Sequence, residues 1–507
     1  MPHLARVRAA ELDGIEAKLI DVEVDLNVGL HSFNIIGLAD KALSEARERV
    51  GSALKNSGVK PPTKDNRKIT VNLAPADIKK TGSQYDLAIA IGYLLATDQI
   101  KRFSTDDKLF LGELGLDGKL RPIAGSLSFV MLAKRRGISY VFLPPENARE
   151  ARIISGVKLI PTPDLYTLLG HLSEEKIIEP EQYVEPEAKQ TQGVDISEIR
   201  GQESAKRALV VAAAGGHNVL MSGPPGSGKT MLAQALVSLL PPPSIEETIE
   251  SSQVWSAAGL LNGSYLTSRP FRAPHHTASL AAIVGGGQNP RPGEISLAHR
   301  GILFMDELPE FHRDLLEALR QPLESGTVSI ARAKASLTLP ARFILVAAMN
   351  PCPCGYWGDK EKECRCSANE VFRYQKKISG PLLDRIDIQI TVPRMKIDEL
   401  RKKPDGTADD LREQVSRARK IQSERFNKAG INNLVNTEMS SKDCEKFIEL
   451  TPEADKFLKN IFDKSLLSTR GYYRILKTAR TIADLEGSEK TDANHIAEAF
   501  QLRVREE

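Results

Sequence analysis

The alternation of apolar and polar residues predicts two half-buried strands near the start of the chain. Apolar and polar residues alternate over 20–26, and the same period of two returns over 69–73. This period places successive side chains on opposite faces of a sheet. Asp117-Gly118 lies between two further strand-like runs and favours a hairpin turn. Together with helical patterns, these features predict an α+β domain over residues 1–172. The helical patterns lie at about 40–56, 84–96 and 126–136.

Beyond this domain the pattern predicts a linker, a second domain and a helical region. Residues 173–197 are acidic, contain prolines and lack apolar periodicity, as is typical of a linker. Apolar, strand-like runs recur within 198–395, and this pattern favours an α/β fold. The remaining residues, 396–507, are predominantly helical. The helical segment 411–426 carries several arginines and lysines, which predict either a solvated face or a DNA-facing stripe.

An apolar run that ends at residue 222 leads into a stretch with the spacing of a phosphate-binding loop, Gly-x-x-x-x-Gly-Lys-Thr. The glycines let the backbone direct several N–H groups at one anion, and the N-terminus of the following helix adds partial positive charge. We expect Lys229 to reach the β- and γ-phosphates of ATP, and Thr230 to ligate Mg²⁺. A Gly/Pro-rich surface turn is the alternative, which the flanking strand and helix patterns disfavour. The members of the loop are Gly223, Pro224, Pro225, Gly226, Ser227, Gly228, Lys229 and Thr230.

Two acidic residues follow the apolar run 302–305. Asp306 is expected to hold Mg²⁺ through water, and Glu307 to orient and polarise the attacking water. Hydrolysis needs both, because Mg²⁺ neutralises phosphate charge but does not activate the nucleophile. An Asp-Glu pair after a strand is common by itself, so the upstream phosphate loop is what favours the catalytic interpretation.

Composition places the chain among large globular proteins. A length of 507 residues suggests two to four domains, and 41% hydrophobic with 27% charged residues is ordinary for a soluble protein. No apolar run approaches the length of a membrane span and no secretory signal is evident, so we expect a cytoplasmic protein without a membrane partner. The net charge of +3 neither demands nor excludes nucleic acid. Any DNA site must therefore be a local patch.

Four of the five cysteines lie in one short polar segment, 351–367. Four thiolates suit tetrahedral Zn²⁺, although the Cys-x-Cys spacing is tighter than the usual gap between zinc ligands. Structural zinc and free thiols therefore both remain open. The fifth cysteine, Cys444, is expected to be buried in a helix. The clustered residues are Cys352, Cys354, Cys364 and Cys366.

Several motifs resemble those of AAA+ ATPases from the magnesium-chelatase-like branch. The apolar run 343–349 ends at Asn350, which is similar to the sensor 1 residue that helps to place the attacking water. Residues 380–387 resemble the arginine-finger segment, in which Arg385 would reach the γ-phosphate of a neighbouring subunit. An ion pair within its own chain, with Asp384 or Asp387, is the alternative for Arg385. Arg470 matches sensor 2, and Arg474 is the second candidate for that role.

The N-terminal segment resembles the Lon-protease-like domain, which shares the fold of ribosomal protein S5 domain 2. Residues 112–125 and 137–147 carry this resemblance. Active Lon proteases use a Ser–Lys dyad, and its two positions fall here on Gln84 and Leu127. Ser83 would restore the serine only with a shift of one residue. The resemblance therefore implies a proteolytically inactive scaffold that binds something else.

Residues 272–277 (Arg-Ala-Pro-His-His-Thr) and 348–355 (Ala-Met-Asn-Pro-Cys-Pro-Cys-Gly) narrow the resemblance to the ComM/YifB family. This resemblance covers the whole chain and implies an AAA+ αβα core with a helical lid, assembled as a homohexameric ring. It further implies an ATP-driven helicase that acts on branched or single-stranded DNA during natural transformation. The alternative is a chelatase-type motor that remodels a protein partner handling a metal or a tetrapyrrole.

Two insertions are candidates for contacting DNA. Residues 326–339 alternate and predict a hairpin, on which Arg332 and Lys334 would share one face and grip phosphates. The second candidate is the glycine-bearing segment 269–287. Within it, His275 and His276 are expected to have a structural or interface role, because no third metal ligand is evident nearby.

Overall fold

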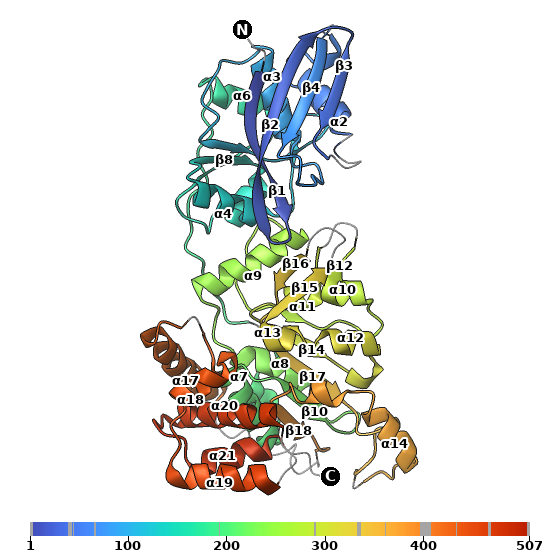
Figure 1. Cartoon of the computed structure of the whole chain (residues 1–507), viewed down its shortest axis with the longest axis vertical. Coiled ribbons are helices and arrows are strands. Elements are labelled where there is room, and N and C mark those ends of the chain that lie inside the picture. Colours follow the sequence, from blue (N-terminus) through green and yellow to red (C-terminus); the bar gives the residue numbers. More distant parts are fainter. Residues whose placement is uncertain are drawn as a thin grey trace.

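A computed structural model shows an N-terminal domain at one end of the molecule, and an α/β core beside a helical unit at the other (Figure 1). The expected α/β class, with a parallel sheet and a C-terminal helical domain, is confirmed. The structure describes residues 4–38, 43, 45–64, 67–191, 193–287, 291–331, 336–359, 361–395, 407–431, 433–464 and 468–503.

The N-terminal domain is built on a four-stranded sheet with the order β1-β2-β4-β3. β1, β2 and β4 are antiparallel neighbours, and β3 is parallel to β4. The alternating segment 20–26 lies in β2, where its apolar side chains are buried and the acidic ones are half-buried. The strands are β1 (Leu4–Asp13), β2 (Glu16–Val28), β3 (Ser32–Ile36) and β4 (Arg67–Ala74).

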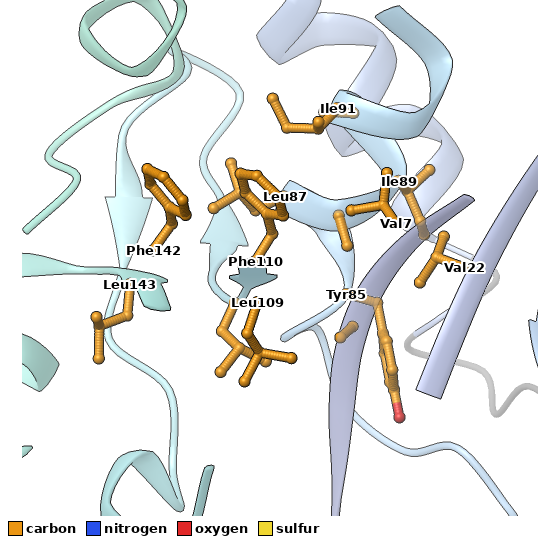
Figure 2. Close-up of a cluster of buried hydrophobic side chains, with 14 of the residues drawn as sticks. Val7, Val22, Tyr85, Leu87, Ile89, Ile91, Leu109, Phe110, Phe142 and Leu143 are labelled. Carbon is orange, nitrogen blue, oxygen red and sulfur yellow. The ribbon is translucent and has the colours of Figure 1, made fainter. Parts of the chain in front are cut away.

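Helices and a second sheet, with the order β5-β8-β9, complete this domain. α3 is buried along its whole length, because it lies between the two sheets. Figure 2 shows Leu87 of α3 beside Phe110 of β5, and Ile89 facing Val7 and Val22 of the first sheet. The elements are α2 (Ala46–Asn56), α3 (Asp86–Ala96), β5 (Lys108–Phe110), α4 (Ser126–Arg136), β8 (Tyr140–Leu143), α5 (Pro145–Ala151), β9 (Lys158–Pro161) and α6 (Leu165–Leu172).

The hairpin expected at Asp117-Gly118 is present. β6 (Glu113–Leu114) pairs with β7 (Leu120–Arg121) in an antiparallel arrangement. Gly118 has a φ of +85°, a left-handed conformation that glycine adopts without a steric penalty.

The segment after α6 crosses from the N-terminal domain to the core. Between Leu172 and the short 3₁₀ helix Ile196–Glu198, the described residues form no helix or named strand. Near its end the segment is fixed to the core, since Gln190 Nε2 donates to the carbonyls of Ser238 and Leu240, both at 2.8 Å.

The core contains a parallel five-stranded sheet with the order β11-β14-β17-β10-β18. β17 therefore lies between β14 and β10, although it follows both in sequence. The carboxyl ends of these three strands meet at one edge, which is where open α/β sheets bind ligands. The strands are β10 (Val219–Ser222), β11 (Phe271–Arg272), β14 (Ile302–Met305), β17 (Ile344–Met349) and β18 (Ile388–Thr391). The larger core helices are α7 (Glu203–Gly215), α8 (Lys229–Leu239) and α9 (Ile245–Ala258).

A hairpin extends from the core toward the N-terminal domain (Figure 1). β15 (Thr327–Ala331) and β16 (Ser336–Pro340) form it, with Ala331 opposite Ser336, as the alternation over 326–339 predicts. The short helix α13 (Pro322–Ser325) leads directly into it. Leu337 lies so close to Gly14, in the β1–β2 turn, that a Cβ atom there would be 2.1 Å from Leu337 Cδ1. The hairpin therefore contacts the N-terminal domain.

The N-terminal domain rests on the core through α4 and α9. Gly125 N donates to Ser256 O at 2.8 Å, Gln253 Nε2 donates to Ile15 O at 2.6 Å, and the hydroxyls of Ser126 and Ser256 are 3.2 Å apart. A small apolar cluster adds to this junction. Ile249, Leu261 and Tyr265 also pack against the apolar core of the N-terminal domain, so the contact combines polar and apolar groups.

The C-terminal unit is helical, and its longest helix uses its basic residues in an unexpected way. Arg412 pairs with Asp195, Arg419 Nε donates to Ala213 O, and Arg425 pairs with Asp484. These arginines fix α17 to the rest of the protein, so the basic run is not one continuous solvated or DNA-facing stripe. None of the described helices is both long and apolar enough to span a bilayer. The helices are α17 (Ala408–Lys428), α18 (Ser441–Phe447), α19 (Pro452–Lys464), α20 (Thr469–Glu486) and α21 (Ala493–Gln501).

Candidate functional site

The phosphate loop connects β10 to α8, so that Lys229 is the first residue of that helix. Gly226 and Gly228 have positive φ angles of +77° and +87°, which bend the backbone around a concave centre. The Oγ atom of Ser227 is buried and has no hydrogen-bond partner among the described residues. The loop thus offers backbone N–H groups, a helix N-terminus and an uncommitted hydroxyl, and this set fits a polyphosphate.

The amine of Lys229 is buried and already held in position. Its Nζ donates to the carbonyls of Gly223 and Pro224 at 2.7 and 3.0 Å, and to Asn350 Oδ1 at 3.2 Å. Burial lowers the pKa of Lys229, and the carboxylates of Asp306 and Glu307 oppose that shift. Asn350, the residue similar to sensor 1, therefore lies directly beside the lysine that is expected to bind phosphate.

The carboxylate of Asp306 lies next to the hydroxyl of Thr230. Thr230 Oγ1 donates to Asp306 Oδ2 at 3.3 Å, and the backbone N–H of Glu307 donates to Asp306 Oδ1 at 2.9 Å. A hydroxyl and a carboxylate are the hard oxygen ligands that Mg²⁺ prefers beside nucleotide phosphates. These two side chains therefore fit the magnesium ion of a nucleotide complex.

Glu307 is exposed and faces a histidine that the sequence did not connect with it. Its backbone has a φ of +52°, which is uncommon for a residue with a side chain. His276 Nδ1 lies 3.5 Å from Glu307 Oε2, and the ring of His275 lies against that of His276, tilted by 32° with centroids 4.1 Å apart. His276 thus contacts the candidate catalytic acid. The strands that precede the two residues, β11 and β14, are neighbours in the sheet, and the sequence does not give this order.

Arg385 lies away from the phosphate loop of its own chain. It is buried, donates from Nη1 to Pro381 O at 2.7 Å, and forms an ion pair with Glu324. It precedes β18, whose first residue Ile388 pairs with Val219 at the start of β10. The phosphate loop follows the opposite end of β10, so the two features lie at opposite edges of the sheet.

Arg470 joins Arg385 at the same carboxylate. Arg470 Nη2 lies 3.1 Å from Glu324 Oε1, and both side chains are about half exposed. Arg474 has a different role, since it pairs with the buried carboxylate of Asp387. Burial alone would raise the pKa of Asp387, but the charge of Arg474 lowers it far below its usual range. The structure therefore groups Arg385 with Arg470 and leaves Arg474 in a buried ion pair.

The four clustered cysteines converge on one point. Their Sγ atoms all lie within 4.8 Å of one another, and Cys352 Sγ is 3.4 Å from that of Cys354 and 3.6 Å from that of Cys364. Tetrahedral zinc with Zn–S bonds of about 2.3 Å requires S···S distances of about 3.8 Å. Backbone N–H groups, of which that of Arg365 contributes most, lower the pKa of Cys354 to about 6, whereas burial raises that of Cys364 to about 12. The donor set and spacing fit a zinc ion.

Comparison with known proteins shows the family. A relative, competence protein ComM of Haemophilus influenzae, is 43% identical over 508 residues, which covers 99% of this chain and 97% of the relative. The protein YifB of Escherichia coli is 40% identical over 497 residues, with 97% and 95% covered. The chain belongs to the ComM/YifB family of magnesium-chelatase-like AAA+ proteins. Membership of this family implies ATPase activity with ATP and Mg²⁺.

The ComM/YifB-family chain is also related to chelatase subunits, more distantly. The magnesium-chelatase 38 kDa subunit of Rhodobacter capsulatus is 26% identical over 327 residues, covering 59% of this chain and 83% of that subunit. Three family models match successive parts of the chain. They are "Subunit ChlI of Mg-chelatase" over 22–147, "Magnesium chelatase, subunit ChlI" over 195–400 and "Magnesium chelatase, subunit ChlI C-terminal" over 406–503.

In this ComM/YifB-family chain, the side chains at the two dyad positions of the Lon-like domain, Gln84 and Leu127, make other contacts. Gln84 Nε2 donates to Glu11 Oε2 at 3.0 Å, and Leu127 is fully buried. Ser83 Oγ donates to a carboxylate oxygen of Glu113. No lysine contacts Ser83 among the described residues, and this arrangement does not resemble a Ser–Lys dyad.

The proposed DNA contacts, Arg332 and Lys334, lie outside the described residues. The strands that lead to them are described, and they extend the hairpin away from the nucleotide site toward the β1–β2 turn. Their role in binding DNA therefore stays a prediction.

Proposed function

We propose that this chain is an ATP-driven DNA translocase that works as a homohexameric ring and moves branched recombination intermediates, as in natural transformation. The near full-length relationship to a protein named for competence supports the biological setting. The proposal takes the chain to be cytoplasmic, with DNA and copies of itself as partners.

The position of Arg385 is the main observation that supports assembly into a ring. β10 and β18 are parallel, each with four residues, and a strand rises about 3.3 Å per residue. Arg385 is therefore separated from its own phosphate loop by roughly 13 Å of sheet. An arginine that stabilises the γ-phosphate must then come from a neighbour, and such head-to-tail contacts can close into a ring.

Each residue of the site has a distinct task in hydrolysis. The loop 223–230 binds the phosphates, and Lys229 meets the β- and γ-oxygens. Mg²⁺, held through Thr230 and Asp306, supplies positive charge against the phosphates. Glu307 accepts a proton from the attacking water, which Asn350 helps to place. Charge that develops on the γ-phosphate is met by Arg385 and Arg470 of the adjacent subunit.

We also propose structural zinc as a third cofactor, held by the four clustered cysteines. Metal analysis of full-length protein is expected to find about one zinc per chain, because a structural site with four thiolates binds zinc tightly. Replacement of Cys352 and Cys364 by serine is expected to remove it. Protein purified without chelators that contains no stoichiometric metal contradicts this assignment.

A chelatase-type motor is the second candidate function. The relationship to a magnesium-chelatase subunit favours it, and in that case the ring would remodel a protein partner that handles a metal or a tetrapyrrole. The nucleotide site has the same chemistry in both candidates, so the site cannot separate them.

The deciding experiment is the ATPase rate with and without forked or four-way DNA. A translocase is expected to hydrolyse ATP faster on DNA, because binding the track favours the active arrangement of the ring. The variant Lys229→Ala is the control for contaminating ATPase. No response to any DNA structure, from protein that hydrolyses ATP, favours the chelatase-type motor.

A further inference from the structure

The cysteine loop (residues 351–367) begins directly after the residue that is hydrogen-bonded to Lys229. The loop follows Asn350, whose side chain accepts a hydrogen bond from Lys229 Nζ at 3.2 Å. Its first peptide is also fixed, because Gln375 Nε2 donates to Pro351 O at 3.1 Å. Cys352, the second residue of the loop, is fully buried. The candidate metal ligands therefore start two residues after the nucleotide site.

The same loop returns to touch the phosphate loop at Gly355. A Cβ atom at Gly355 would lie 2.6 Å from Cδ and 2.8 Å from Cγ of Pro225, and 3.8 Å from Cγ of Asn350. Contacts below 3.0 Å are not tolerated by a real Cβ atom, and the proline ring belongs to the phosphate loop itself. Gly355 has a φ of +86° and donates its N–H to Cys352 O at 3.0 Å. Its backbone thus lies flush against Pro225.

The four cysteines join the start of this loop to its end. Its described residues, 351–359 and 361–367, contain no helix or strand. Arg394 lies 3.6 Å from the largely buried carboxylate of Asp359, which also accepts hydrogen bonds from the backbone N–H groups of Glu361 and Lys362. These contacts order one turn of the loop, whereas a metal ion bound by four thiolates fixes four points of the chain at once.

We infer that the metal-bound cysteine loop is a wall of the nucleotide site, and that the occupancy of the metal sets the affinity of the phosphate loop for ATP. This inference rests on the proposed zinc site and on the nucleotide site of the family. The metal holds Cys352 and Cys354 in place. The peptide of Gly355 then supports Pro225, and the start of the loop supports Asn350. Loss of the metal removes both supports without touching Lys229, Thr230 or Asp306.

The test uses two glycines of the same loop. Gly355→Ala places a methyl group against Pro225 and leaves all four cysteines intact. Gly358→Ala is the matched control, because Gly358 also has a positive φ, +77°, but no atom lies within 4 Å of its added Cβ. Both variants carry the same kind of backbone strain, so a difference between them reports the contact with Pro225.

Bound zinc per chain and the Kd for a fluorescent ATP analogue are measured on each full-length protein. Gly355→Ala is expected to keep its zinc but to bind the analogue roughly tenfold more weakly, because Pro225 must move away from the added methyl group. Gly358→Ala is expected to match the wild type in both measurements. Unchanged affinity in Gly355→Ala with zinc retained overturns the inference and leaves the proposed zinc site intact.

A second arm removes the metal itself. Wild-type protein treated with a zinc chelator is expected to lose affinity for the analogue in step with its zinc, and to regain it when zinc is added back. The double variant Cys352→Ser/Cys364→Ser is expected to keep a weak affinity for the analogue after zinc addition. An affinity for the ATP analogue that does not depend on zinc content overturns the inference. Wild-type protein that is purified without any bound metal overturns the zinc proposal as well.

Discussion

Single residues from distant parts of the chain make the nucleotide site, and each is placed by the end of a strand. Lys229 and Thr230 follow β10, Asp306 and Glu307 follow β14, and Asn350 follows β17. Lys229 shows what this placement achieves. Its buried amine is held by carbonyls of its own loop, so a phosphate meets a lysine that has already lost most of its conformational freedom.

The acid at position 307 is expected to act on water rather than to bind ATP. Glu307→Gln should bind ATP normally but hydrolyse it at least ~100-fold more slowly, because a positioned base contributes about that much. Lys229→Ala should instead weaken binding. ATP turnover and nucleotide binding are measured together, with Glu310→Gln as a control from the same turn, where the carboxylate pairs with Lys377. Normal turnover by Glu307→Gln would exclude Glu307 as the base.

A buried ion pair at the start of α9 gives a prediction with a pH dependence. Glu247 accepts two hydrogen bonds from Arg269, at 3.0 and 2.7 Å. Burial alone would raise the pKa of Glu247, but the charge of Arg269 and its hydrogen bonds lower it to about 2. Glu247→Gln leaves a buried arginine without its counter-charge, so a loss of about 3–5 kcal/mol in stability is expected near pH 7.

The pH dependence of this effect follows from the lowered pKa. The pair contributes its full stability above the ordinary carboxyl pKa of 4.5, and that contribution is lost as the pH falls through about 2. The melting temperatures of wild type and Glu247→Gln should therefore converge in acid. Glu246→Gln, which changes an exposed neighbour on the same turn, should have the melting temperature of the wild type at every pH. A difference in melting temperature between wild type and Glu247→Gln that widens in acid would contradict the assigned pKa.

At the scale of elements, the period of hydrophobic residues predicted most of the structure. The strands over 20–26 and 69–73, the hairpin over 326–339 and the helix over 126–136 are all present, because each buries one face and alternates or repeats accordingly. Pattern could not show which element a charged residue would face. Arg412 and Arg419 of α17 look solvated in sequence but bind the core, since their partners come from segments about two hundred residues away.

The residues proposed to bind phosphate and Mg²⁺ are easier to find in the sequence than their neighbours. They stand in a few short motifs, so their spacing indicates them. His276 lies in the motif 272–277, but nothing in the sequence pairs it with Glu307, and Glu324 lies in no motif that points to Arg385. Contacts made by tertiary structure alone leave no periodic signal in the chain.

Helix α13 carries a carboxylate that competes with phosphate. Glu324 pairs with both Arg385 and Arg470, and the shared negative charge reduces the positive charge that the two arginines present to a neighbour. Glu324→Gln is therefore expected to raise the ATPase rate several-fold in the absence of DNA. Glu317→Gln, which alters the contacts with Arg320 and Ser379 but none with Arg385 or Arg470, is the matched control. A lower rate in Glu324→Gln would show that this carboxylate orients the arginines instead.

At the scale of the whole molecule, the separation of Arg385 from its own phosphate loop implies that one copy of the chain is incomplete. The proposed ring supplies the missing arginine at every interface. It also predicts that two defective copies can restore each other, because each lacks a different half of the shared site.

Mixing Arg385→Ala subunits with Lys229→Ala subunits tests this geometry. Each variant alone should be nearly inactive, since a finger acting in trans contributes roughly 10³-fold or more. In mixed rings some interfaces combine an intact Lys229 with an intact Arg385, so ATPase activity should partly recover. Size measurements establish that mixed rings form. Mixed rings without any recovery would show that Arg385 has only a structural role in its own chain, through its ion pair with Glu324.

The junction between α4 and α9 has a consequence for how the N-terminal domain is held. Serine hydroxyls, a glutamine and backbone groups join the two surfaces, and Ile249 of α9 packs against the apolar core of the N-terminal domain. The segment 173–197 is also fixed on both sides, since Val184 N donates to Arg152 O and Lys189 N donates to Thr267 O. Few residues lie between these two anchors. A ligand that turns the N-terminal domain against the core must therefore break the contacts at α9 and those along this segment together.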